Sequence, residues 1–380
     1  MKIRSYHKFW QKIHESAKEK KFPLRAMFEL TYRCNFKCPH CYIPFSYRKY
    51  GELKTEEIFS ILDQLKGLGC FYLGFTGGEP FVREDIMDIL WYAKRCGFEV
   101  IIYTNGSLIN KRIAVELQQL RPNKVDITLP GISREVFEKI TGVAGSHKKT
   151  FRAIELLNRN QVNLGFKSCL LKENEPEMSQ IKRFAASLGA LHRLDDMLSA
   201  RLDGSEEPFK YRASGVEDRR NGIEKSKPSD YQGTEPLNCE YSSDKQQLDG
   251  ISLFKCGVGQ SQVAITPLGE LKMCLMIDWP KYKISTDNKS QNGNLKRVWN
   301  KLKKLVLDIE VDENYQCDKC KLESYCKWCP AKSWLYNRTF TRCEPESQRQ
   351  AEYRYRMVNP NGGEQCRKEV VIGSGRLKEI

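Results

Sequence analysis

Three cysteines within one short loop constrain this sequence more than any other feature. Cys34, Cys38 and Cys41 have the spacing C-x3-C-x2-C, which lets three thiols converge on one point. Structural zinc and iron sites are normally closed by four protein ligands, whereas three ligands leave a position open for a small molecule. The loop follows an apolar run at residues 24–30, which predicts a buried strand with the cysteines at its carboxyl end.

The composition is that of a globular protein with many thiols. The chain has 380 residues, of which 40% are hydrophobic, enough for one large domain and a smaller one. No apolar run reaches the length that spans a bilayer, and residues 1–22 lack the apolar core of a secretion signal. We therefore expect a cytoplasmic protein without a membrane partner. Fifteen cysteines in a reducing compartment favour metal or redox roles over disulfides.

From residue 24 onward, strand patterns alternate with helical patterns. The expected strands cover residues 24–30, 71–76, 99–104, 124–129, 162–171 and 191–198. Six strand–helix units predict an α/β fold, a partial (β/α)6 TIM-like barrel made of a curled parallel sheet. The expected divisions are an N-terminal helical cap at 1–23, the barrel at 24–198, a polar bridging region at 199–250, a cysteine-rich region at 251–345, and a C-terminal helix and tail at 346–380.

Polar motifs stand where the later strands end. The second strand ends in Gly77-Gly78-Glu79-Pro80. Paired glycines let a backbone approach a ligand closely, and the Glu79 carboxylate can bind an ammonium group, although this motif alone usually forms a tight turn. The polar residues of the next three strands are Thr104 and Asn105, then Thr128, then Asn174.

Seven further cysteines follow in the second region. They are Cys256, Cys274, Cys317, Cys320, Cys326, Cys329 and Cys343. A C-x2-C pair followed by another C-x2-C pair is also typical of a zinc ribbon. A zinc-binding nucleic-acid or scaffold protein is therefore an alternative from another functional class.

The three-cysteine loop, with the aromatic His40 before its last cysteine, closely resembles that of the radical S-adenosylmethionine (SAM) enzymes. In that family the three cysteines hold a 4Fe-4S cluster whose open iron binds SAM. The GGEP motif one strand later resembles the family's binding motif for the methionine amino group. The resemblance implies these SAM-binding residues: His40, Gly77, Gly78, Glu79, Pro80, Thr104, Asn105, Thr128 and Asn174.

The order of the seven later cysteines resembles a C-terminal SPASM domain, which holds two auxiliary 4Fe-4S clusters. By this resemblance the first auxiliary cluster is held by Cys256, Cys274 and Cys329, and the second by Cys317, Cys320, Cys326 and Cys343. Either Cys239 supplies the fourth ligand of the first cluster or that position is open. The chain departs from the usual pattern in having two residues, not three, between Cys326 and Cys329.

The resemblance implies an oxidoreductase-type enzyme that cleaves SAM to a 5′-deoxyadenosyl radical and modifies a peptide. Maturases of ribosomally made peptides match best, and the product is a thioether, a crosslink, an epimerised residue or an excised fragment. An anaerobic sulfatase maturase and a tetrapyrrole-modifying enzyme remain alternatives of the same class. Pro130 stands where many relatives carry an acidic or aromatic residue, so no catalytic acid or base is assigned.

The expected partners follow from charge and length. The net charge of +15 favours an acidic precursor peptide, and nucleic acid is not expected because Lys and Arg are spread along the chain rather than gathered in a helix stripe. Only 23 residues precede the barrel, too few for a leader-binding domain. The peptide is therefore expected to be recognised by the bridging region at 199–250, by the second domain or by a separate leader-binding protein. The family also needs an electron donor such as flavodoxin or ferredoxin.

Overall fold

The computed structural model describes residues 3–213, 253–254, 256–286, 294–313 and 315–358. Its centre is one sheet with the strand order β6-β5-β4-β3-β2-β1-β7-β8-β9. The strands are β1 (Arg25–Thr31), β2 (Tyr72–Gly77), β3 (Glu99–Thr104), β4 (Lys124–Thr128), β5 (Leu164–Cys169), β6 (Leu191–Asp195), β7 (Gln262–Ile265), β8 (Glu270–Lys272) and β9 (Lys281–Lys283).

Helices surround this sheet. The α-helices are α1 (Ile3–Lys20), α2 (Thr55–Gly67), α3 (Ile86–Arg95), α4 (Lys111–Leu120), α5 (Arg134–Thr141), α6 (Ser146–Arg159), α7 (Met178–Ser187), α8 (Asn294–Leu307), α9 (Pro330–Asn337) and α10 (Pro345–Val358). Short 3-10 helices occupy Phe45–Lys49, Pro80–Val82, Glu175–Glu177, Glu207–Tyr211, Cys317–Lys319 and Glu323–Tyr325.

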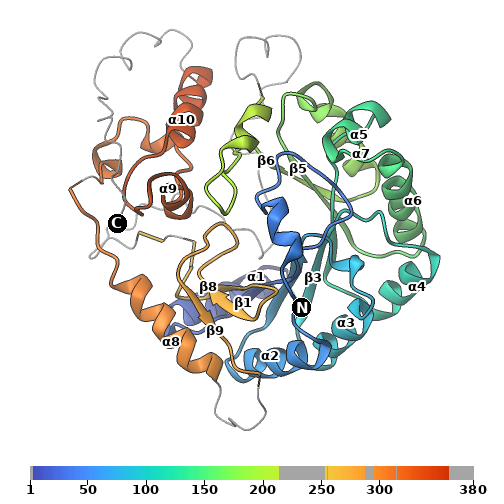
Figure 1. The fold of residues 1–380 in the computed structure, drawn as a ribbon, viewed down its shortest axis with the longest axis horizontal. Helices are drawn as coiled ribbons and strands as arrows, with labels where there is room; N and C mark the ends of the chain where they lie inside the picture. Colours follow the sequence, from blue (N-terminus) through green and yellow to red (C-terminus); the bar gives the residue numbers. More distant parts are fainter. Residues whose placement is uncertain (1–2, 214–252, 255, 287–293, 314, 359–380) are drawn as a thin grey trace.

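Strands β1 to β6 form the predicted partial barrel. Each pairs with the next in parallel, and α2 to α7 form an arc outside the strands (Figure 1). The fold class and all six expected strands are therefore confirmed. Strands β5 and β6 are shorter than expected, because the ends of the runs at 162–171 and 191–198 leave the sheet.

The two faces of the sheet differ in polarity. Ala26, Phe28 and Leu30 of β1 pack into the main hydrophobic core with the apolar face of α2. Because side chains alternate along a strand, Glu29 points to the opposite, inner face. Further along that sheet, Arg193 of β6 forms an ion pair with the buried Asp126 of β4 at 3.0 Å. The inner face thus holds charged groups in pairs.

The cysteine-rich region continues the barrel sheet. Strand β7 pairs in parallel with β1, from Arg25 opposite Gln262 to Phe28 opposite Ile265. Strands β8 and β9 extend the sheet in antiparallel pairing. Sequence patterns indicated no strands here, because runs of three or four residues carry too little periodicity to be recognised.

Helix α1 lies at the amino ends of the first strands, and the residue that follows it contacts α8. Ala17 of α1 packs on Leu24 and Tyr72, and the indole Nε1 of Trp299 in α8 donates to the carbonyl oxygen of Lys21 at 3.2 Å. The exposed side of α8 carries a basic stripe, Lys296, Arg297, Lys301 and Lys304, and the helix contains no acidic residue. The expectation that basic residues form no helix stripe is therefore wrong for α8.

Parts of the expected organisation lie outside the described residues. They are most of the bridging region, at 214–252, and the tail at 359–380. Among the described residues, no helix combines the length and apolar character needed to cross a bilayer.

Phe28→Ala is expected to destabilise the barrel. The side chain is fully buried beside Phe75, with ring centroids 6.4 Å apart. Its removal leaves a cavity, so the free energy of unfolding should fall by about 3–5 kcal/mol. Thermal denaturation measures the loss. Val115→Ala at an exposed site on α4 is the control, with an expected change below about 0.5 kcal/mol; equal effects of the two variants would contradict the prediction.

Candidate functional site

The loop that carries Cys34, Cys38 and Cys41 follows β1 at the carboxyl end of the barrel. It is held by the protein backbone on one side, where Lys37 N donates to Thr141 O at 2.8 Å. On the other side the guanidinium of Arg48 donates to the carbonyl oxygens of Cys34 and Phe36, at 3.2 and 2.7 Å. Arg48 was not identified from sequence, because its contact with the loop depends on the turn between them.

The three thiols share one electrostatic environment. Burial raises the pKa of each, that of Cys34 to about 11, and the Arg48 guanidinium opposes this shift at all three. Cys41 and Cys34 further raise the pKa of Cys38, so the thiols are close enough to disfavour one another's ionisation. Thiolates in this loop need a compensating positive charge, which a bound iron cluster would supply.

The GGEP motif lies directly against the start of this loop. A Cβ atom on Gly77, whose φ is +125°, would lie 2.2 Å from the carbonyl oxygen of Thr31. A Cβ on Gly78 would lie 2.1 Å from the carbonyl oxygen of Arg33. Even without a ligand, glycine is therefore required at both positions, because two backbone segments approach each other closely there. Their proposed approach to SAM stays a prediction.

Glu79 is fully buried, and its carboxylate joins its own turn to the end of β3. Oε1 accepts hydrogen bonds from Phe81 N at 3.1 Å and Thr104 Oγ1 at 2.7 Å, and Oε2 accepts one from Asn105 N at 2.6 Å. Burial raises the pKa of Glu79 to about 7, although these three hydrogen bonds oppose the shift. Both oxygens are thus bound by protein donors, and the predicted contact with the methionine ammonium stays a prediction.

Asn105 connects the third strand back to the cysteine loop. Its Nδ2 donates to Asn35 Oδ1 at 2.8 Å and lies 4.0 Å from Cys34 Sγ, while Asn35 Nδ2 donates to Ser107 Oγ at 2.8 Å. Asn35 and Ser107 were missed from sequence. The sequence offered little to identify them: Asn35 is a polar residue between two cysteines, and Ser107 is a polar residue that follows the Asn-Gly turn.

The other predicted SAM residues occupy different surroundings. Pro80 is buried at the start of a 3-10 helix, and Thr128 is exposed at the end of β4. His40 Nδ1 is buried without a hydrogen-bond partner in the described part of the chain, and burial lowers the His40 pKa to about 4. Asn174 is fully buried, and its Nδ2 donates to the carbonyl oxygens of Pro130 and Cys169, both at 2.9 Å. Asn174 therefore joins the ends of β4 and β5.

The later cysteines gather into two groups. Burial raises the pKa of Cys274, and Cys329 and Cys256 raise it further. Burial also raises the pKa of Cys343 to about 12, with further contributions from Cys326, Glu344, Cys317 and Cys320. These influences run within the two groups named from the sequence, and the role of the groups as ligands of auxiliary clusters stays a prediction. Cys239, the possible fourth ligand of the first group, lies outside the described residues.

These thiol groups do not form sites for a single ion. Within the described ranges, no three His, Cys, Asp or Glu side chains are placed to hold one metal ion. A four-iron cluster binds each cysteine through a different iron, so its ligands stand farther apart than those of one ion. Three half-buried thiols beside the cationic Arg48 guanidinium, with an unpaired His40 nitrogen nearby in sequence, fit such a cluster with one open position.

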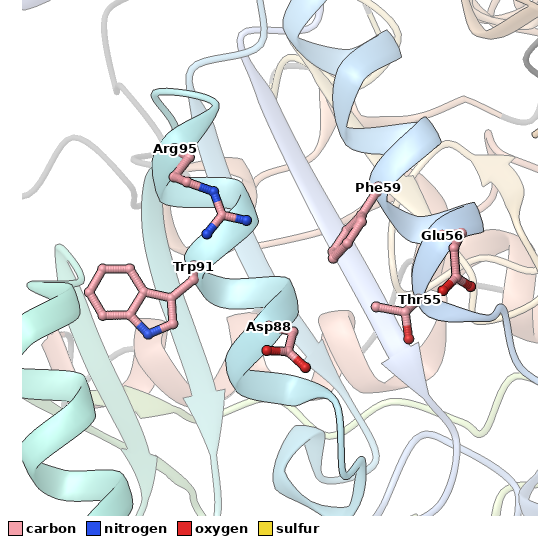
Figure 2. Close-up of a pocket in the computed structure, with 6 residues that line it drawn as sticks. All are labelled: Thr55, Glu56, Phe59, Asp88, Trp91 and Arg95. Atoms are coloured by element: carbon pink, nitrogen blue, oxygen red, sulfur yellow. The ribbon is translucent and has the colours of Figure 1, made fainter.

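A separate hollow lies on the helical layer. It has a volume of about 440 Å³ and is lined by Thr55, Glu56, Phe59, Asp88, Trp91 and Arg95 from α2 and α3 (Figure 2). None of these residues belongs to the predicted site.

Comparison with known proteins agrees with this geometry. The model of the radical SAM superfamily matches residues 28–185. These residues form a radical SAM domain. The matched segment contains the three-cysteine loop, the GGEP motif and β1 to β5, so the resemblance seen in the sequence is confirmed.

Several curated relatives are similar to the chain. The subtilosin biosynthesis protein AlbA of Bacillus subtilis is 26% identical over 331 residues, which cover 83% of this chain and 69% of AlbA. The AdoMet-dependent heme synthase of Oleidesulfovibrio alaskensis is 30% identical over 164 residues, 43% of this chain. The mycofactocin maturase MftC of Mycobacterium ulcerans is 38% identical over 135 residues, 36% of each chain. The match to the heme synthase spans only 42% of that protein's length.

Solved structures share the fold over most of the chain. Streptococcus suis SuiB bound to S-adenosylmethionine superposes with a TM-score of 0.62 at 16% identity, covering 92% of this chain and 84% of SuiB. AnSMEcpe with bound AdoMet gives a TM-score of 0.58 at 15% identity, covering 89% and 97%. The shared fold includes the C-terminal region, beyond the part that the family model matches.

Glu79→Gln is expected to remove a pH dependence of stability. The pKa of Glu79 is raised to about 7 in the native chain, from an ordinary value of 4.5. The unfolded chain therefore loses this proton first, and native stability falls as pH rises between these two values, by roughly 3 kcal/mol. Because an amide does not titrate there, the thermal midpoint of the cluster-free variant should lack this decline.

The exposed Glu135→Gln on α5 is the matched control and should keep the decline. A Glu79→Gln profile parallel to that of the native chain would show that the buried carboxylate is ionised throughout.

Proposed function

We propose that this chain is a radical SAM enzyme that modifies a peptide. The observation that carries the proposal is the extent of the similarity to AlbA, which covers 83% of the chain, against 43% for the heme synthase. A match of that extent reaches beyond the barrel into the cysteine-rich region. Two fold relatives have been solved with peptides bound: SuiB with the precursor peptide SuiA and anSMEcpe with the peptide Cp18Cys.

We propose residue roles that the placement of the side chains supports. Cys34, Cys38 and Cys41 would hold the first cluster, with Arg48 balancing their charge. With SAM and a one-electron-reduced cluster bound, the site would supply a 5′-deoxyadenosyl radical for hydrogen abstraction from a substrate. Glu79 and Asn105 brace the motifs beside the loop. The remaining predicted contacts of His40, Gly77, Gly78, Pro80, Thr104, Thr128 and Asn174 with SAM belong to this proposal.

The C-terminal region is proposed to be a SPASM domain with two auxiliary clusters. Cys256, Cys274 and Cys329 would hold one, and Cys317, Cys320, Cys326 and Cys343 the other. The electrostatic grouping of these thiols supports the assignment. A flavodoxin or ferredoxin is proposed as the electron donor, and a separate protein is proposed to bind the peptide's leader.

A tetrapyrrole substrate is the second candidate. It is favoured by the identity to the heme synthase and by the Fe-coproporphyrin III synthase of Methanosarcina barkeri, 31% identical over 157 residues. Both matches are confined to less than half of this chain, so they say little about the cysteine-rich region that would close over a substrate.

Replacing Cys34, Cys38 and Cys41 by Ala together should abolish SAM cleavage. Without these thiols no iron can bind SAM, while the auxiliary groups remain, so iron should fall from about twelve to about eight per chain. The measurements are 5′-deoxyadenosine formed with dithionite, and iron and sulfide content after anaerobic reconstitution. Cys70→Ala, at a buried thiol whose Sγ lies 3.7 Å from Leu24 O, should cleave SAM normally. Normal cleavage by the triple variant would refute the site.

The reconstituted protein is expected to alter a short precursor peptide encoded beside its own gene. Mass spectrometry distinguishes the products: a crosslink or thioether lowers the mass by lost hydrogen, epimerisation takes up deuterium from heavy water, and excision gives shorter fragments. Iron coproporphyrin is the competing substrate, and the triple-cysteine variant is the control. Turnover of the porphyrin with no change in the peptide would replace the first candidate by the second.

A further inference from the structure

A buried ion pair connects the barrel to the cysteine-rich region. Lys272 Nζ of β8 lies 2.9 Å from Glu29 Oε2 of β1, and both side chains are fully shielded from solvent. The hydroxyl of Tyr42 donates to Glu29 Oε1 at 2.9 Å. Lys272 Nζ also lies 3.4 Å from the carbonyl oxygen of Leu275. None of these three side chains was singled out from sequence.

Stability alone is a poor explanation for this pair. Moving two charges out of water is costly, and replacing a buried ion pair by apolar residues of similar size is often neutral or stabilising. Apolar residues would suit the interior between β1 and β8, as Ile265 and Leu271 do nearby. The full burial of a carboxylate and an ammonium therefore indicates a role other than stability, either for the two charges or for the fixed distance between the two strands.

The pair stands between two cysteine groups. Tyr42 directly follows Cys41, and Lys272 precedes Cys274 by two residues. Burial raises the pKa of Cys41, and the Glu29 carboxylate adds to that shift. Burial raises the pKa of Cys274, and the Lys272 ammonium opposes that shift. Each charge thus acts on a thiol of a different group.

We propose that Glu29 and Lys272, anchored by Tyr42, are a positioning pair that fixes the Cys34–Cys41 loop relative to Cys274 and balances the electric field at both cysteine groups. This inference rests on the proposed function, because it concerns the clusters those cysteines would hold. Fixed charges near a cluster change the energy of adding an electron, and opposite charges in contact largely cancel at a distance.

The test is the reduction potential of the cluster whose electron paramagnetic resonance signal changes when SAM is added. In Lys272→Met at pH 8.5, the unpaired negative charge of Glu29 should make reduction of the cluster harder, so its reduction potential should fall. An unpaired Lys272 in Glu29→Gln should shift it up. The double variant Glu29→Gln/Lys272→Met carries neither charge, so its potential should return close to the native value.

Two further variants separate position from charge. Lys272→Arg keeps the charge and should keep the native potential, whereas Tyr42→Phe removes the hydroxyl and should broaden the signal of the same cluster. Lys124→Met is the matched control, since Lys124 is buried and lies 3.6 Å from Asp126 in another ion pair, on β4. It should lower the thermal midpoint without moving the potential.

The experiment distinguishes failure of this inference from failure of the proposed function. If the unaltered protein shows no SAM-sensitive signal, the proposed function fails. If that signal is present and Lys272→Met, Glu29→Gln and the double variant all keep the native potential, the pair is structural and this inference is overturned. Should one single variant fail to fold, the other still decides, because either unpaired charge is expected to move the potential, and a native value would overturn the inference.

Discussion

The backbone of residues 77–79 lies against the backbone of residues 31–33, and the arrangement of the site depends on this contact. Gly78 N donates to Thr31 O at 2.8 Å and Glu79 N to Arg33 O at 2.9 Å, so pairing between the two segments continues past the ends of β1 and β2. A side chain at either glycine would separate them. From there Glu79 holds Asn105, and Asn105 returns to Asn35 in the cysteine loop. The hydrogen bonds form a closed circuit, so the three motifs keep their positions together.

Much of this fold could be predicted because parallel barrel strands are continuous apolar runs. The third strand was expected at the residues where it is found, Glu99–Thr104, since Val100, Ile101 and Ile102 are all buried. The cysteine loop and GGEP were recognisable because their spacing is local. The direction of the Glu79 side chain could not be predicted, because it depends on contacts with Thr104 and Asn105, some 25 residues away.

Contacts between segments that are distant in the sequence could not be predicted from local sequence patterns either. Arg48 reaches the cysteine loop only because the chain turns back through a 3-10 helix at Phe45–Lys49. The pairing of β7 with β1 joins segments more than two hundred positions apart, and the short β7 gives little signal of its own. Lysine is usually a surface residue, yet the ammonium of Lys272 is buried and lies beside the Glu29 carboxylate. Such partners emerge from the folded arrangement rather than from local sequence.

The parallel pairing of β7 with β1 has a consequence for how the chain folds as a whole. Because β7 occupies the open side of β1, the first barrel strand is an inner strand of the sheet instead of an edge. A chain cut before residue 262 would leave the backbone N–H and C=O groups of a long apolar strand unpaired, which is a template for aggregation. The sheet of the barrel is therefore incomplete on this side until residues 262–265 have been synthesised and have paired with β1.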